Sequence, residues 1–361
     1  MKALVVNALG RGFELEDIDI AAPIGREVLV DVKASGLCHT DLLFASNDIV
    51  PMPAVLGHEV AGIVAEIGPE VRQFRVGDHV VGSLAQCCGA CARCLSGRSF
   101  QCLHPESTLR RPSDPARLSR RGAGLFQGLG LGGFAERALI HENQLALLSN
   151  EMPFAQAALL GCGVVTGAGA VLNTAQARAG DTVVVFGAGG VGLNAISGAR
   201  IAGASRIVAI DIQVKRLEAA RQFGATDIID STKSNPVEAV HSLLPRGADH
   251  VFDFVGLKAV AEQGLAMLGV GGGLYLVGVA KPEVNIELNI FAAIGGQKRV
   301  QGVNFGSTNF KRDIPMYAAL YLQGRMNLDD LVSKRISLRE VNDGYAALND
   351  GSLNRVVVTS F

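Results

Sequence analysis

The chain has 361 residues, 48% of them apolar, which is long for one domain and predicts two. Lys and Arg number 33 against 34 Asp and Glu, giving a formal net charge of −1, and Trp is absent. This composition argues against a nucleic acid or a membrane surface as partner. The longest uncharged segment, residues 152–177, contains proline, glycines and polar residues, so we expect no membrane span. The N-terminus is a poor signal peptide, and a cytoplasmic protein is expected.

The first eighty residues of the chain predict strands and turns. β-branched runs closed by glycine occupy residues 28–36 and 61–68, and a turn followed by a strand occupies residues 75–83. Residues 103–133 mix proline, glycine and arginine, which favours a long, solvated surface loop over a polyanion site. The five arginines of this segment are Arg110, Arg111, Arg117, Arg120 and Arg121.

From about residue 180, short apolar strands alternate with helical patterns. Helices are predicted at residues 191–202 and 214–225. The predicted strands are residues 182–186, 206–211, 226–230, 250–256, 273–279 and 299–303. This alternation predicts an α/β fold with a parallel, doubly wound sheet.

A glycine-rich turn follows the first of these strands. Residues 187–192 read G-A-G-G-V-G, and Asp211 ends the next strand 19 residues after Gly192. This is the setting of a dinucleotide-binding loop. Gly187 permits the tight turn, Gly189 lets the pyrophosphate approach the backbone, and Gly192 lets helix and strand pack closely. The amides of Gly190 and Val191 then lie at the helix N-terminus, which attracts phosphate.

The residue at the end of the second strand selects between nicotinamide cofactors. Asp211 would accept hydrogen bonds from an adenosine ribose and repel a 2′-phosphate, which favours NAD. Lys215 and Arg216 nearby leave NADP as an alternative. A strand-end aspartate that only caps the next helix is the other interpretation.

Five of the seven cysteines lie within residues 87–102. In a reducing compartment, clustered cysteines more often bind metal than form disulfides. Four of them follow the spacing C-x2-C-x2-C-x7-C, namely Cys88, Cys91, Cys94 and Cys102. Four thiolates suit a closed, structural Zn²⁺ site, with an iron–sulfur cluster as the alternative. Cys87 breaks the spacing and is interpreted as a bystander.

The two other cysteines suggest a second metal site. Cys38 lies in GLCHTD and Cys162 in GCG, with His58 between them in GHE. Two thiolates and one imidazole form the ligand set of a catalytic zinc that keeps a fourth position open. Two buried cysteines and a core histidine are the alternative.

The motifs GLCHTD, GHEVAGIVAEIG, the four-cysteine loop, GCGVVTG and GAGGVG occur in an order and at spacings that resemble the zinc-dependent alcohol dehydrogenases of the medium-chain dehydrogenase/reductase family. The resemblance spans nearly the whole chain. It implies a mainly β, GroES-like catalytic domain of residues 1–163 and 305–361. A Rossmann-like NAD-binding domain of residues 164–304 would be inserted between them. It also implies two zinc ions per subunit, the four-cysteine loop holding the structural one.

The resemblance assigns roles by position. Cys38, His58 and Cys162 would hold the catalytic zinc. Asp41 would orient His58, Glu59 would lie behind the metal and assist ligand exchange, and Thr40 would relay the substrate proton. The residues expected to contact the cofactor are His39 and Arg355 at the pyrophosphate, Thr166 at the nicotinamide, residues 187–192, Asp211, Arg216 and Val279.

One position departs from the pattern. Well-known members carry a histidine five residues after the first zinc cysteine, where this chain has Leu43. The proton would then leave through water or His39. The departure resembles the benzyl- and aryl-alcohol branch, so it favours bulky, long-chain or aromatic primary alcohols. Leu84, Leu129 and Val279 are expected to form the apolar pocket wall.

The long segment 103–133 resembles the dimeric members, so a homodimer is favoured over a tetramer, paired through residues 271–279 or 299–303. The function expected is hydride transfer between a primary alcohol and NAD. An S-(hydroxymethyl)thiol formaldehyde dehydrogenase is the alternative, in which the loop arginines would meet a glutathione-like carrier. A non-catalytic protein that binds nucleotide and zinc is the alternative from another class.

Overall fold

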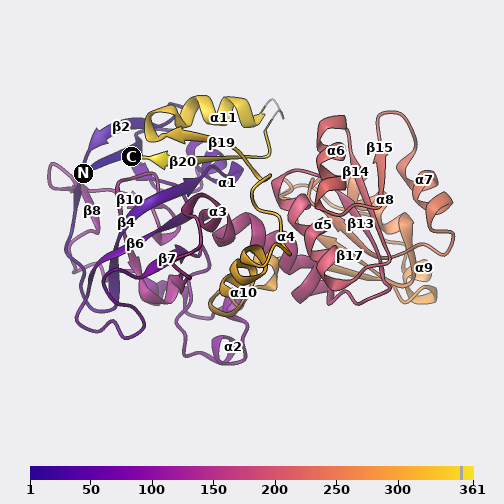
Figure 1. Cartoon of the computed structure of the whole chain (residues 1–361), viewed down its shortest axis with the longest axis horizontal. Helices are drawn as coiled ribbons and strands as arrows, with labels where there is room; N and C mark the ends of the chain where they lie inside the picture. Colours follow the sequence, from indigo (N-terminus) through magenta and orange to yellow (C-terminus); the bar gives the residue numbers. More distant parts are fainter. Residues whose placement is uncertain (350–352) are drawn as a thin grey trace. The chain divides into compact units, whose positions relative to one another are not determined.

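The computed structural model describes residues 1–349 and 353–361 (Figure 1). The chain divides into two compact units. Unit 1 comprises Met1–Cys162 and Asn309–Phe361, and unit 2 comprises Gly163–Thr308. The expected boundaries, after residues 163 and 304, lie one and four residues from these.

Unit 2 is built on a six-stranded sheet in the order β15-β14-β13-β16-β17-β18, with every neighbouring pair parallel. In chain order these strands read 3-2-1-4-5-6, the order of dinucleotide-binding sheets. The strands are β13 (Thr182–Phe186), β14 (Arg206–Asp211), β15 (Asp227–Asp230), β16 (Ala248–Asp253), β17 (Leu268–Leu276) and β18 (Arg299–Gly302). The predicted doubly wound fold is confirmed.

Helices separate these strands along the chain, as Figure 1 shows. They are α5 (Gly190–Ala202), α6 (Val214–Phe223), α7 (Pro236–Leu243), α8 (Lys258–Met267) and α9 (Ile290–Gly295). Strands covered by helices read as continuous apolar runs, and Val184, Val208 and Val251 are fully buried. The strand predicted at residues 273–279 instead spans Leu268–Leu276. Val279 therefore lies beyond the end of the strand, and it is 78% exposed.

Unit 1 is mainly β. Its largest sheet runs β12-β7-β6-β4-β20-β19, with β11 also paired to β4. The strands of unit 1 are β1 (Lys2–Val6), β2 (Glu14–Asp17), β3 (Asp19–Ile20), β4 (Glu27–Gly36), β5 (Ala54–Val55), β6 (Glu59–Ile67), β7 (His79–Gly82), β8 (Leu118–Arg120), β9 (Ala123–Gly124), β10 (Phe126–Gln127), β11 (Arg137–His141), β12 (Leu145–Leu147), β19 (Val332–Ser337) and β20 (Arg355–Ser360). Because β20 pairs with β4, the end of the chain completes the sheet that its start began.

The helices of unit 1 are short, apart from α10. They are α1 (His39–Ser46), α2 (Ala92–Leu95), α3 (Phe154–Leu159), α10 (Phe310–Leu322) and α11 (Val341–Asn349). After α3 the chain stays helical through η5 (Leu160–Val164), α4 (Val165–Gly169) and η6 (Ala170–Ala175), and both η5 and η6 are π-helical. The segment Phe154–Ala175 is long and apolar enough to cross a membrane, but 83% of its apolar 18-residue stretch is buried inside the protein. Burial of that extent is typical of a core helix.

The prediction that residues 103–133 form a solvated surface loop is wrong in part. It forms the short strands β8, β9 and β10, and Leu118 and Leu131 are buried. Arg117 is also buried, and it pairs with Glu27 of β4 at 2.7 Å, while Arg110 pairs with the same carboxylate at 2.6 Å. Burial would raise the pKa of Glu27, but hydrogen bonds from Arg110 and Arg117 outweigh it and hold the pKa below its usual value. The two arginines therefore anchor the segment to the sheet, because a buried carboxylate needs counter-charge.

Candidate active site and cofactor loop

Cys38 lies where the long strand β4 turns into helix α1. It is the residue before the helix, with extended backbone angles of φ −120° and ψ 143°. The preceding residue is held by the C-terminal strand, since the N–H of Leu37 donates to the carbonyl of Val356 at 2.9 Å. Asp41 follows in the first turn of α1 and is buried. The Cys-His-Thr-Asp motif thus sets a thiol and a carboxylate on one short turn.

His58 is held in one orientation by Asp41. Its Nδ1 lies 2.9 Å from Asp41 Oδ2, and the other carboxylate oxygen accepts the N–H of Gly57 at 2.9 Å. With Nδ1 engaged, Nε2 is left to face Cys162, whose Sγ is 3.4 Å away. A carboxylate that fixes the far nitrogen of a histidine is the usual support of a metal ligand. The role of Asp41 in orienting a zinc ligand stays a prediction, which this hydrogen bond supports.

Cys162 lies in the π-helical turn η5. Single π-turns inside helices often occur at functional sites, because the extra residue redirects a side chain. The neighbouring Gly161 packs so tightly that a Cβ there would lie 2.3 Å from the carbonyl oxygen of Gly82. A larger residue would push η5 away from strand β7, so this glycine keeps Cys162 close to the sheet that carries His58.

The donor atoms of four residues meet at this point. Those of Cys38, His58, Glu59 and Cys162 all lie within 4.8 Å of one another. A tetrahedral zinc ion would separate a sulfur and an imidazole nitrogen by about 3.6 Å. The 3.4 Å between His58 Nε2 and Cys162 Sγ fits that value. The residues present therefore suit a zinc ion held by two thiolates and one imidazole.

The charges of the cluster favour a cation. A hydrogen bond from the Cys162 thiol lowers the pKa of Cys38 well below its usual value and raises the pKa of Cys162 well above it. Burial would lower the pKa of His58, but the charges of Asp41 and Cys38 outweigh it and raise that pKa well above its usual value. The group thus favours a thiolate at Cys38 and retains protons at Cys162 and His58. A metal ion bound by these three residues would displace those protons.

Glu59 is fully buried beside these ligands. Among the described residues, neither of its carboxylate oxygens has a hydrogen-bond partner. Burial raises its pKa to about 7. The nearest cation is Arg355, whose Nη1 lies 3.4 Å from Glu59 Oε1 and donates to the carbonyl of Leu37 at 3.4 Å. A buried carboxylate with so few partners is costly unless an ion compensates for it.

Arg355 is itself buried, beside Glu59. Its expected contact with the cofactor pyrophosphate stays a prediction.

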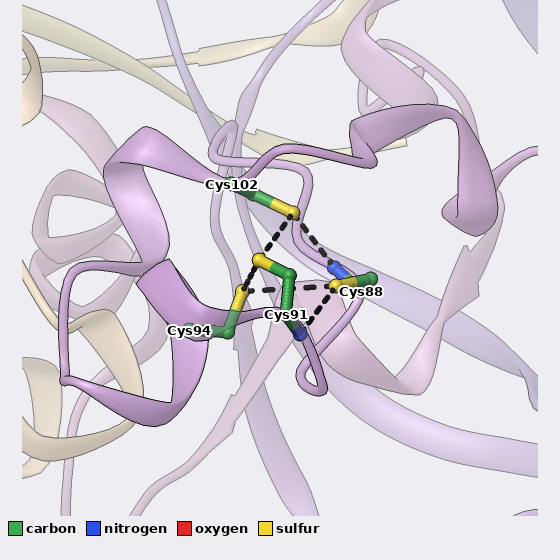
Figure 2. Close-up of side chains that lie close together, drawn as sticks. All are labelled: Cys88, Cys91, Cys94 and Cys102. Atoms are coloured by element: carbon green, nitrogen blue, oxygen red, sulfur yellow. Dashed lines mark hydrogen bonds between the residues drawn. The ribbon is translucent and has the colours of Figure 1, made fainter.

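The four-cysteine loop has the geometry of a closed zinc site, as Figure 2 shows. The Sγ atoms of Cys91 and Cys94 are 3.6 Å apart, those of Cys88 and Cys94 are 3.9 Å apart, and those of Cys91 and Cys102 are 4.0 Å apart. Four sulfurs bonded at about 2.3 Å to a tetrahedral zinc ion would be separated by about 3.8 Å. All four are free thiols, far outside the ~2 Å of a disulfide.

Backbone donors also face these sulfurs. The N–H of Cys91 donates to Cys88 Sγ at 3.2 Å, and the N–H of Cys88 donates to Cys102 Sγ at 3.2 Å. Such bonds stabilise thiolates. Cys87 donates to the carbonyl of Asn143 at 3.4 Å, and burial raises its pKa to about 11. It lies outside both donor clusters. Its expected role as a bystander stays a prediction.

The glycine loop of unit 2 follows β13 and opens α5. Gly187 has φ +86°, which other residues adopt only with strain, and a Cβ on Gly192 would lie 1.8 Å from the carbonyl oxygen of Gly187. Both glycines are thus required by the protein's own packing. Gly189 is different, because a Cβ there would meet no atom within 4 Å. Its φ of −75° suits any residue. The space beside Gly189 is the cradle that a bound pyrophosphate would fill.

Asp211 lies at the end of β14, next to this loop. Its Oδ2 accepts the N–H of Ala188 at 2.8 Å and lies 3.9 Å from Arg216 Nη1, while Oδ1 accepts the N–H of Gln213 at 2.9 Å. The carboxylate is mostly buried. It therefore ties the glycine loop to the second strand, and its remaining lone pairs are available to a ribose.

Gly189→Ala is expected to weaken NAD binding by about 10-fold or more without changing stability, because the new methyl group would meet only the ligand. Isothermal titration with NAD and a melting curve would measure both effects. Gly192→Ala is the matched variant, and it should lower the melting temperature, since its Cβ would clash with the backbone. Unchanged NAD affinity in Gly189→Ala would show that the cofactor does not lie on this loop.

The other expected site residues lie as follows. On α1, His39 is exposed, Thr40 is half-buried and Leu43 is 38% exposed. The two residues of unit 1 that were expected to line the substrate pocket are Leu84, which is buried, and Leu129, which is half-buried. In unit 2, Thr166 is half-buried on α4 and Val279 is exposed after β17. The structure brings together Cys38, His58, Cys162, Asp41, Glu59 and Arg355, all within unit 1.

One contact at this site was missed by the sequence reasoning. The hydroxyl of Tyr345 donates to the carbonyl of Cys38 at 3.1 Å, across 307 positions in the chain. No local pattern marks such a pair, because it depends on how α11 packs.

These features define a zinc-binding dehydrogenase, and comparison with known proteins agrees. Residues 25–150 match the alcohol dehydrogenase GroES-like domain, and residues 190–320 match the zinc-binding dehydrogenase family. The chain belongs to the zinc-dependent alcohol dehydrogenase family, and it is an oxidoreductase of that type.

Similar proteins cover the chain from end to end. It is 38% identical to an NDMA-dependent alcohol dehydrogenase of Amycolatopsis methanolica, over 99% of this chain and 98% of that one. It is 36% identical to an S-(hydroxymethyl)glutathione dehydrogenase of Escherichia coli, over 99% of each. Among solved structures, benzyl alcohol dehydrogenase from Acinetobacter calcoaceticus matches with a TM-score of 0.93 and 34% identity, covering 100% of this chain and 99% of that one.

A second solved structure is an alcohol dehydrogenase zinc-binding domain protein from Burkholderia ambifaria. It matches with a TM-score of 0.95 and 37% identity, and covers 100% of this chain and 98% of that one.

Proposed function

We propose that the protein transfers hydride between a primary alcohol and NAD, with two zinc ions per subunit and a preference for bulky, long-chain or aromatic alcohols. The observation that carries this proposal is the buried cluster of Cys38, His58 and Cys162, with His58 oriented by Asp41. When bound, zinc would supply a Lewis acid for the substrate oxygen and NAD would supply the hydride acceptor.

The chain's own residues have the remaining tasks. Cys38, Cys162 and His58 would hold the metal, and Asp41 would keep the His58 ring in the ligating orientation. Thr40 follows Cys38 by two positions in α1, and its hydroxyl would accept the substrate proton and pass it on. Leu43, further along α1, has no titratable group, so the proton would leave through His39 or through water.

The apolar side chain at Leu43 also supports the substrate preference, together with Leu84 and Leu129 as wall residues. Similarity to a protein named benzyl alcohol dehydrogenase supports the same preference. For the cofactor, the nearly buried Asp211 carboxylate next to the glycine loop favours NAD over NADP, since it would meet a 2′-phosphate with like charge.

Oxidation of an S-(hydroxymethyl)thiol is the second candidate, supported by the relative named S-(hydroxymethyl)glutathione dehydrogenase. The arginines of residues 103–133 give this second candidate less support than expected, because three of the five already pair with carboxylates of the chain. Arg110 and Arg117 both pair with Glu27, and Arg120 pairs with Glu16 at 2.5 Å. Arg111 and Arg121 are the exposed arginines of that segment. A non-catalytic protein is disfavoured, because such a protein has no need for a buried three-ligand cluster.

The experiment is NADH formation by zinc-loaded protein with ethanol, long-chain, benzyl and cinnamyl alcohols, and hydroxymethylglutathione. NADP is tested beside NAD, and NDMA is added in a parallel series because one relative is named for it. We expect kcat/KM to rise with the bulk of the alcohol and to be higher with NAD. Turnover of the thiol adduct alone would move the assignment to the second candidate. No turnover of any substrate by protein that binds NAD would refute both.

We also propose a homodimer paired through β18. We prefer β18 to the alternative expected at residues 271–279, because β17 is already paired on both sides. β18 is at the sheet edge with all its residues exposed, and the nearby α9 exposes Ile290, Phe291 and Ile294. An unpaired strand edge flanked by exposed apolar side chains can pair with the same edge of a second copy of the chain.

Sedimentation velocity should give twice the chain mass of 37.7 kDa. Phe291→Asp is expected to give a monomer, and Val270→Asp, at an exposed apolar residue of β17, is the control. A dimer that persists in Phe291→Asp would place the interface elsewhere.

We place the protein in the cytoplasm, as both clusters need reduced thiols and all seven cysteines are free. Cell fractionation would test this location, and recovery from an oxidising compartment would contradict it.

A further inference from the structure

The hydroxyl of Tyr345 reaches the backbone of a proposed zinc ligand. Tyr345 lies on α11 and donates to the carbonyl oxygen of Cys38 at 3.1 Å. The same oxygen accepts the N–H of Asp41 at 3.1 Å. Two donors therefore fix the peptide that joins Cys38 to the first turn of α1, and that turn carries His39 and Thr40.

The ring that carries this hydroxyl has little freedom. Tyr345 is 3% exposed and stacks on Phe13, with ring centroids 5.3 Å apart and an angle of 14° between the planes. Phe134 meets it edge-on, at 79°. Phe13 is clamped in turn by Asn342, which accepts its N–H at 3.0 Å and donates to its carbonyl at 2.9 Å. The hydroxyl is thus aimed from a rigid aromatic cluster.

Other contacts hold the adjacent residue, Leu37. The N–H of Leu37 donates to Val356, and the carbonyl of Leu37 accepts Arg355. A Cβ on Gly344, the neighbour of Tyr345, would lie 2.7 Å from Leu37 Cδ2, so α11 presses directly on this segment. The hydroxyl is the point at which α11 bonds to the peptide that leads into α1.

We infer that Tyr345 is a positioning residue for the active site: its hydroxyl holds the Cys38 carbonyl, and thereby the Cys38 thiolate and the Thr40 hydroxyl, in their working positions. The inference rests on the proposed function, because it takes Cys38 as a zinc ligand. Partners that orient metal ligands without touching the metal typically change metal affinity by 10–100-fold when removed.

Tyr345→Phe removes the hydroxyl and keeps the stacked ring. The control is Tyr317→Phe, since Tyr317 is also fully buried, on α10, and its hydroxyl has no hydrogen-bond partner in the described part of the chain. Asn342→Ala is a second test variant, which leaves the hydroxyl in place but frees Phe13 beneath it. Circular dichroism would establish that each variant is folded.

The first readout is the rate of zinc transfer to a coloured chelator, which needs no turnover. In Tyr345→Phe, one of the two zinc ions should leave roughly 10-fold faster than in the wild type, with the other unchanged. In Asn342→Ala the same phase should be faster by a smaller factor, and in Tyr317→Phe both phases should match the wild type. The second readout is kinetic: kcat should fall in Tyr345→Phe while the KM for NAD stays the same, because Cys38 and Thr40 act on the alcohol.

Equal zinc release and equal kcat in Tyr345→Phe and Tyr317→Phe would overturn the inference, even if the wild type oxidises alcohols as proposed. Conversely, a wild type that holds two zinc ions but oxidises no alcohol would refute the proposed function, while faster zinc release from Tyr345→Phe would still support the positioning role.

Discussion

Cys162→Ser is expected to lower kcat/KM for alcohol oxidation by about 10³-fold or more and to reduce the zinc content from two ions per chain to one. The side chain is buried and its Sγ lies 3.4 Å from His58 Nε2, so a shorter, harder oxygen would leave the cluster with one thiolate and an unfilled position. A metal acting as Lewis acid contributes several kcal/mol to the transition state, and each 1.36 kcal/mol is about a tenfold change in rate. Steady-state kinetics and elemental analysis would measure both effects.

Cys87→Ser is the matched control. It changes another buried cysteine, but one that donates to the carbonyl of Asn143 and lies outside both donor clusters. Serine can keep that hydrogen bond, so zinc content and kcat/KM should match the wild type. If Cys162→Ser kept two zinc ions and full activity, the catalytic metal site assigned here would be wrong.

Cys94→Ser is expected to act on stability, with a loss on the order of 4 kcal/mol or more in the free energy of unfolding. Residues 88–102 contain the four-residue helix α2 and the three-residue turn η1 (Ser99–Gln101), and none of the four cysteines is buried. Elements this short are not stable by themselves. We therefore expect the loop to depend on a metal ion bound by the four sulfurs, which lie close together in Figure 2.

Thermal melting and limited trypsin digestion would measure this loss. Arg98 is exposed within the loop, so cleavage after Arg98 should become fast in Cys94→Ser and stay slow in the Cys87→Ser control. The catalytic cluster shares no ligand with this loop, so the zinc ion held by Cys38, His58 and Cys162 should remain. A melting temperature equal to that of the wild type would refute a structural role for this loop.

Taken together, the two variants separate the metal sites. Cys162→Ser should abolish turnover in a folded protein, and Cys94→Ser should weaken a protein whose remaining folded fraction still turns over. A protein with one functional zinc site would not show both patterns.

The amino-acid sequence determined the features that depend on neighbouring residues. Strands β13 and β14 occupy the predicted residues 182–186 and 206–211, because β-branched runs buried on both faces need no distant partner to be recognised. The glycine loop can be recognised from the sequence because local backbone geometry requires glycine at positions 187 and 192. The four-cysteine loop is likewise local, since its ligands lie within fifteen residues of one another.

The tertiary structure decided the features that depend on a charge or a hydrogen-bond donor from a distant segment of the chain. Residues 103–133 have the composition of a solvated loop, but Arg110 and Arg117 are anchored by Glu27, 83 and 90 positions earlier. The bond from Tyr345 to Cys38 spans 307 positions. Composition and periodicity report the preferences of a residue and its near neighbours, whereas the burial of a charge and the aim of a hydroxyl depend on which partner the packed chain brings within hydrogen-bond distance.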